Sequence, residues 1–352
     1  MGKTDAFTIG TLSYFPASLK AEAGSTIDFE SVFTGEPHTV TFGTLVDEGM
    51  KELKAAGEEA EDEPASLQKL PPLLPDGPGD ANQMAANPCF IDSGDPPTDK
   101  ACPKREQPEF DGTQSVYNSG FLPEGARFEV KLADDIAAGT YTYFCLLHRG
   151  GMVGTVEVVE SGADTPETVE KAGQAGFDTL VNRLKPIAEE MKKGALADLV
   201  PAAPGQVLAG GASAEVEAAL VQDFGPKELS IKTGSSVTWV VVGPHTVSFN
   251  APEDLASSAI IKGPDGAFHA NEKVFAPAGG PGAPEGPPSD GPPGPPKIVD
   301  GGRFDGSGFR SSGIFLSFPP SLLGYKLTFT KAGTYPYECL IHPGMEGTVK
   351  VA

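Results

Sequence analysis

Residues 339–345 read CLIHPGM, a segment that offers a thiol, an imidazole and a thioether within a short loop. A thiolate, two imidazole nitrogens and a weak axial Met are the ligand set of a blue-copper site. A second imidazole is available from His245, which lies in the sequence GPHTV at residues 243–247. We therefore predict a copper site with four ligands: His245, Cys339, His342 and Met345.

The same pattern occurs earlier in the chain. Residues 145–152 read CLLHRGGM, and residues 37–40 upstream of them read PHTV. Zinc also accepts Cys and His, but a thioether is a poor zinc ligand, so the repeated Met favours copper. The longer spacing between His and Met changes the expected axial distance but not the ligand types. We predict a second copper ion, held by four ligands: His38, Cys145, His148 and Met152.

Composition excludes two classes of function. The 352 residues include 26 Lys and Arg against 48 Asp and Glu, which gives a net charge of −22. Such a chain does not suit nucleic acid, whose phosphates select basic surfaces, whereas it would attract basic partners. The longest apolar runs, such as residues 237–242, are far shorter than the roughly 20 residues of a membrane span. No membrane-spanning helix is expected.

The cysteines bear on the compartment. Cys89 and Cys102 lie in a segment rich in Pro, Gly and Asp, where a disulfide would stabilise a loop with little core of its own. The alternative is a pair of free thiols. The first residues lack the features of a signal peptide, so the chain is either cytosolic or a mature form. Because disulfides persist in oxidising compartments, we expect an extracytoplasmic protein, either periplasmic, secreted or at the cell surface.

The chain divides into two β units and a helix. Alternating, β-branched runs predict strands in residues 1–160, interrupted by an insertion at about 44–113 whose acidic stretch, 47–63, has helical character. We interpret this stretch as a solvated face rather than a docking patch. The expected strands of this unit are 7–10, 19–21, 26–30, 38–42, 127–132, 140–144 and 153–159.

Residues 161–204 have a helical period. The sequence DTPE at residues 164–167 supplies an N-cap, a Pro in the first turn and an early acid. Apolar residues recur at Val169, Leu180, Leu184 and Met191, and Pro186 is expected to kink the helix. An apolar stripe of this kind is typical of core-facing helices, so a linker packed across both units is favoured over a membrane-surface helix.

Residues 205–352 repeat the first unit in register. PHTVSF at 244–249 matches PHTVTF at 37–42, and AGTY at 332–335 matches AGTY at 138–141. A second insertion, at about 262–300, is dominated by Pro and Gly, a composition suited to an extended loop.

Each unit resembles a cupredoxin, the blue-copper domain of plastocyanin and amicyanin. The resemblance rests on the PHTV strand, the AGTY strand and Cys-x-x-His followed closely by Met. It implies an all-β fold of two Greek-key β-sandwiches joined by the helical linker, and an electron-transfer function with redox proteins as partners. It also implies that the downstream ligands, His148 and His342, lie near the surface as electron ports, while His38 and His245 are more buried.

Histidine content argues against an enzyme. The chain has five His, of which the two sites use four, leaving only His269. Multicopper enzymes combine blue-copper sites with an additional copper centre, and that centre needs several more His ligands. An alternative is a further metal site built from His269 of three subunits. Two further hypotheses are copper storage without electron turnover and a subunit of a multicopper enzyme.

Overall fold

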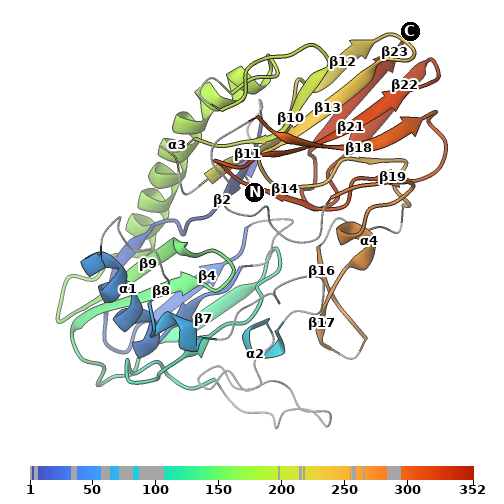
Figure 1. Ribbon diagram of the computed structural model, residues 1–352. Coiled ribbons are helices and arrows are strands. Elements are labelled where there is room, and N and C mark those ends of the chain that lie inside the picture. The colour runs from blue at the N-terminus through green and yellow to red at the C-terminus, as the bar shows by residue number, and fades with distance from the viewer. Residues whose placement is uncertain are drawn as a thin grey trace.

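Strands dominate the regular structure, as the sequence predicts (Figure 1). Cys89 and Cys102 lie outside the described residues, and so does Pro37. The computed structural model describes residues 2–3, 7–32, 38–56, 64–70, 82–86, 107–196, 199–213, 216, 219–253, 255, 259–264, 266–283 and 295–352.

The N-terminal half, residues 1–160, contains a five-stranded sheet and a two-stranded ribbon. The sheet has the order β3 (Ser18–Glu22), β9 (Arg149–Val159), β8 (Gly139–Cys145), β5 (Thr41–Phe42) and β6 (Tyr117–Asn118). The ribbon pairs β4 (Thr26–Glu30) with β7 (Arg127–Lys131). Alternate side chains of both layers fill one core, which includes Phe42, Tyr143 and Val156 from the sheet and Ile27, Phe128 and Val130 from the ribbon.

The C-terminal half, residues 205–352, contains a five-stranded sheet with the same pairing pattern. Its order is β12 (Glu228–Ile231), β23 (Glu346–Val351), β22 (Gly333–Glu338), β15 (Ser248–Phe249) and β19 (Arg310–Ser311). The first pair is parallel and the others are antiparallel, as in the N-terminal sheet. The sequence repeat therefore corresponds to a repeat of strand pairing.

A seven-stranded sheet packs against this five-stranded sheet. It consists of β1 (Gly2–Lys3), β2 (Thr8–Thr11), β11 (Ala219–Gly225), β10 (Gln206–Gly211), β13 (Ser236–Val241), β21 (Leu323–Phe329) and β18 (Lys297–Phe304), in that order. The core between the two sheets contains Trp239, Tyr325 and Leu327 from one side and Phe249, Tyr337 and Val349 from the other. Strand β18 begins at Lys297, so the last residues of the insertion predicted at 262–300 belong to this sheet.

Strand β2, near the start of the chain, joins the C-terminal half. Strand β2 pairs with β11, with Gly10 opposite Leu220 and Ile9 opposite Val221. The sequence predicted this strand but grouped it with the N-terminal unit. Ile9 is fully buried in the apolar cluster that also contains Val221 and Leu184, which accounts for the different pairing.

Helix α3 (Pro166–Met191) contacts both halves (Figure 1). Thr165 caps it by accepting a hydrogen bond from the Thr168 amide, and the helix continues through Pro186. Near its start, Asp164 accepts a hydrogen bond from the Lys20 amide of β3 at 2.7 Å. Farther along, its buried residues pack on the seven-stranded sheet; they are Leu180, Val181, Leu184, Ile187, Ala188 and Met191. No helix in the described part of the chain has the length and apolar content needed to cross a bilayer.

The described parts of both insertions form small elements. The first contains α1 (Thr44–Ala56), the short 3-10 helix η2 (Leu67–Lys69) and α2 (Gln83–Ala86). On α1, Asp47 accepts a hydrogen bond from the Thr142 amide at 2.8 Å, so this acid supports the sheet rather than a solvated face.

The second insertion contributes the hairpin of β16 (Ile260–Lys262) and β17 (Phe268–Ala270), followed by α4 (Glu272–Phe275). Phe268 packs on Phe121 of the N-terminal half, with ring centroids 5.0 Å apart, and exchanges two hydrogen bonds with the Gln83 side chain. The remaining short pair joins β14 (Gly243–His245) to β20 (Phe315–Ser317).

We predict that Ile9→Ala destabilises the C-terminal half by about 2–5 kcal/mol, because it leaves a cavity beside α3 and β11. The single tryptophan, Trp239, lies in the core of that half. Urea unfolding of the metal-free protein followed by tryptophan fluorescence measures the effect. The matched control is Ile27→Ala in the N-terminal core, which should leave the Trp239 transition in place. An unchanged transition in Ile9→Ala would contradict the role of β2.

Candidate metal centres

The first candidate centre lies where strand β8 ends. Cys145 is the last residue of β8, His148 follows in the turn to β9, and His38 precedes β5, which pairs with β8. The ligand atoms of these three side chains lie within 4.8 Å of one another. Sγ of Cys145 is 3.9 Å from Nδ1 of His38. The structure therefore brings together three of the four residues predicted for this site.

The second candidate centre has the same construction in the C-terminal half. Cys339 directly follows β22, His342 lies in the next loop, and His245 ends β14. Sγ of Cys339 is 3.8 Å from Nδ1 of His245 and 3.6 Å from Nδ1 of His342. The two Nδ1 atoms are 3.0 Å apart. Donor atoms bound at about 2.0–2.3 Å to one ion lie roughly 3–4 Å from one another, so these spacings fit a metal ion.

A threonine next to the upstream His fixes each cysteine loop. In the second centre the Thr246 amide donates to Sγ of Cys339 at 3.4 Å, and the Thr246 hydroxyl accepts from the Leu340 amide at 2.7 Å. In the first centre Thr39 makes the same two contacts, to Cys145 at 3.4 Å and to the residue after it at 2.8 Å. In the sequence these threonines stand out only as part of the repeat. The sequence signal that could have identified them is their recurrence directly after His38 and His245.

The histidines lower the pKa of both cysteines. Burial alone raises the pKa of the Cys145 thiol, but hydrogen bonds from His148 and His38 outweigh it and hold the pKa well below its usual value. Burial also raises the pKa of Cys339, and there the charge of His342 together with the hydrogen bond from His245 outweighs it. Each cluster therefore favours the thiolate, the form of Cys that binds metals.

Both methionines are buried, and each follows its cysteine within the same short segment of the chain. In the second centre the Cys339 amide donates to the Met345 carbonyl at 3.0 Å, so the loop closes directly on Cys339. In the first centre Phe144 pairs with Val153 and Cys145 with Arg149, so Met152 belongs to a bulge of β9 next to Cys145. Met152 and Met345 are 5% and 0% exposed.

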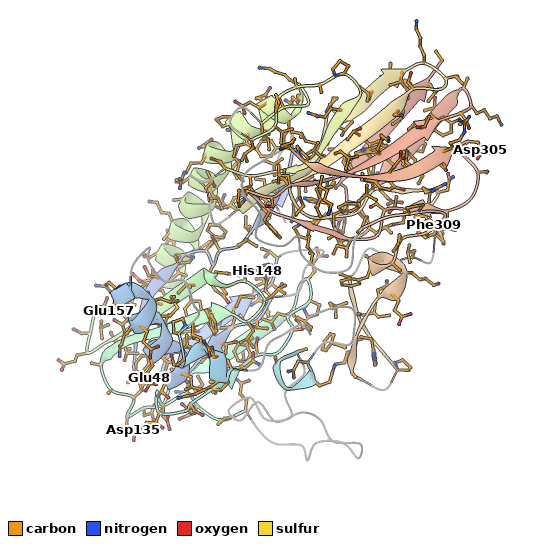
Figure 2. The ribbon with its side chains drawn as sticks, in the orientation of Figure 1. Glu48, Asp135, His148, Glu157, Asp305 and Phe309 are labelled. Carbon is orange, nitrogen blue, oxygen red and sulfur yellow. The ribbon has the colours of Figure 1, made fainter. Side chains whose placement is uncertain are left out.

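The expected electron ports differ between the centres. His148 is partly exposed and His38 is buried, which agrees with the expectation for the first centre. Figure 2 labels His148 on the ribbon of the N-terminal half. His342, by contrast, is 0% exposed, as is His245. The expectation that His342 lies near the surface is wrong, because Gln222 of strand β11 covers its outer edge with Nε2 3.0 Å from Nε2 of the ring.

The aromatic residues around the centres behave as core residues. Tyr143 packs against Tyr14 and Phe42, with ring centroids 4.7 and 4.9 Å apart. The Tyr14 hydroxyl donates to the Thr39 carbonyl at 2.5 Å, which ties Tyr14, a residue outside every sequence motif, to the segment that carries His38. Burial raises the pKa of Tyr14. These contacts place both tyrosines in or against the core of the N-terminal half.

Comparison with known proteins finds similar structures but no sequence family. No protein-family model and no curated protein matches the chain. Amicyanin from Paracoccus versutus is 22% identical over 37% of this chain and 74% of its own, with a TM-score of 0.16. Reduced auracyanin from Roseiflexus castenholzii is 16% identical over 42% and 89%, with a TM-score of 0.22. A purple cupredoxin from Nitrosopumilus maritimus is 17% identical over 37% and 83%, with a TM-score of 0.16. Scores of this size carry no argument about function, which therefore depends on the clusters themselves.

We predict that Thr246→Val destabilises the metal-free protein by about 1–3 kcal/mol, because the buried Leu340 amide loses its acceptor while side-chain size is nearly unchanged. Thr39→Val should give a similar loss in the N-terminal half. Urea unfolding measures both effects. Thr140→Val, at an exposed position of β8, is the control and should change stability by less than about 0.5 kcal/mol. Equal stability of Thr246→Val and this control would contradict the role of the hydroxyl.

Proposed function

We propose that this protein is an electron carrier of the cupredoxin type with two type-1 copper centres, one in each half. The observation that carries the proposal is the second cluster, where a buried thiol sulfur and two imidazole nitrogens lie 3.0 to 3.8 Å apart. The proposed ligands are His38, Cys145, His148 and Met152 in the first centre and His245, Cys339, His342 and Met345 in the second.

The ligand types favour copper over zinc. Each cluster pairs one thiolate with two imidazoles, and each cysteine loop ends in a buried Met. A weak axial thioether is common at blue-copper sites and rare at zinc sites. Bound copper would supply a one-electron couple. The chain's own residues would hold the ligands in one arrangement, because Thr39 and Thr246 tie each cysteine loop to the segment that carries the upstream His.

The carrier role is supported by the available histidines. Both clusters together use four of the five His, and His269 lies opposite Ile261 in the β16–β17 hairpin, outside both clusters found among the described residues. We infer two Greek-key sandwiches, in residues 1–160 and 205–352, with 161–204 between them and β2 contributed to the second. The net charge of −22 favours basic redox partners, and we place the protein outside the cytoplasm, with Cys89 and Cys102 as a disulfide.

We predict that the protein binds two copper ions per chain and develops intense visible absorption that a reductant bleaches reversibly. Cys145→Ser and Cys339→Ser should each remove one thiolate–copper centre, so each loses part of the band and the double variant loses all of it. Metal analysis combined with the visible spectrum measures both quantities. Copper binding without colour would contradict the type-1 assignment, and colour without reversible bleaching would favour copper storage.

We also predict that Met345→Leu and Met152→Leu retain the visible band but raise the redox potential of their own centre. The axial ligand tunes the potential, and loss of a donor disfavours the more positive oxidised ion. Redox titration of each variant in the matching single-centre background measures the shift. A potential equal to that of the parent would show that the Met is not a ligand.

A further inference from the structure

The outer edge of the His342 ring faces a second buried polar side chain. Nε2 of His342 and Nε2 of Gln222 are 3.0 Å apart, and the two residues are 0% and 1% exposed. The other amide atom of Gln222, Oε1, is buried and makes no hydrogen bond in this orientation. The pair therefore allows two arrangements. Either the amide donates to an unprotonated Nε2, or it rotates by 180° and its oxygen accepts from a protonated Nε2.

The geometry of the cluster selects between them. Nδ1 of His342 faces Sγ of Cys339 and Nδ1 of His245, so Nδ1 is the atom available for metal binding. A neutral imidazole that uses Nδ1 as a ligand carries its proton on Nε2. That proton needs an acceptor, and rotation of the Gln222 amide would bring its oxygen to the ring in place of the nitrogen. His245 provides an internal precedent, since its Nε2 lies 3.1 Å from the Val242 carbonyl, which is necessarily an acceptor.

Strand β2 holds Gln222 against the ring. A methyl group added at Gly10 would overlap Nε2 of Gln222, so a side chain at this position displaces the amide. Gly10 pairs with Leu220 of β11, two residues from Gln222. A residue near the start of the chain thus determines the position of a side chain that contacts a ligand more than 300 residues later.

We propose that Gln222 is a positioning residue of the second copper centre, accepting a hydrogen bond from Nε2 of His342 through its amide oxygen. The inference depends on the proposed copper function of that centre. The hydrogen bond fixes the tautomer and the ring orientation of His342 and increases the basicity of Nδ1. The contact is made at a buried ring, since His342 is 0% exposed, whereas its counterpart His148 is partly exposed.

The test uses the full chain with Cys145→Ser, so that only the second centre forms a thiolate site. Copper affinity is measured by competition with a chelator, and the visible spectrum reports the ligand geometry. Gln222→Leu keeps a similar volume without an acceptor and should weaken copper binding by about 10–100-fold with a shifted visible band. Gln222→Glu keeps an oxygen acceptor and should recover most of the affinity and the parental band.

A substitution on strand β2 also tests the contact between Gln222 and His342. Gly10→Ala crowds the amide from β2 and should reproduce the loss seen in Gln222→Leu. Its control is Gly139→Ala, where an added methyl group meets no atom within 4 Å and copper binding should stay at the parental value. Unfolding of each metal-free variant, followed by Trp239 fluorescence, identifies any variant that does not fold.

The outcomes separate this inference from the proposed function. A Cys145→Ser parent that binds copper without a thiolate band overturns the function of the second centre and this inference with it. A coloured parent with folded Gln222→Leu of equal affinity and spectrum overturns the role of Gln222 alone. Equal losses in folded Gln222→Leu and Gln222→Glu also overturn it, because they indicate a packing role instead of an acceptor.

Discussion

The structure depends on keeping two cysteine thiolates buried inside β-sandwich-like cores. Burial by itself disfavours the charged form of a thiol, and the imidazoles of each cluster reverse that preference. The amide of the threonine after each upstream His adds a hydrogen bond to sulfur. This requirement brings together segments 107 residues apart in the first centre and 94 residues apart in the second.

The sheet order follows from the same constraint. The cysteine lies at the end of one strand and the upstream His lies close to the neighbouring strand, β5 in the first half and β15 in the second. Those two strands must be adjacent for thiolate and imidazole to meet. The identical pairing pattern of the two five-stranded sheets places the Cys and His residues of the two clusters in equivalent positions.

The halves differ in what covers the two clusters of Cys and His. In the C-terminal half, β11 and β2 extend the larger sheet, and Gln222 on β11 closes the edge of His342. In the N-terminal half, the second layer has only β4 and β7 among the strands that the structure describes, and His148 remains partly exposed. The same Cys and His types thus occur in a closed and in a more open setting, and the segments responsible are β11, which carries Gln222, and β2, which packs against that side chain.

The sequence by itself determined which Cys and His residues form the two clusters, their repeat and most local elements. Strands with alternating polar and apolar residues, and the helix capped by Thr165, depend on neighbouring residues, and the motif spacing identifies both clusters. The tertiary structure alone decided the partner of β2, the burial of His342 and the contact of Gln222 with its ring. Spacing and periodicity describe residues close in the chain, whereas strand pairing and burial depend on segments far apart, so no local pattern identifies which strand covers a given ligand.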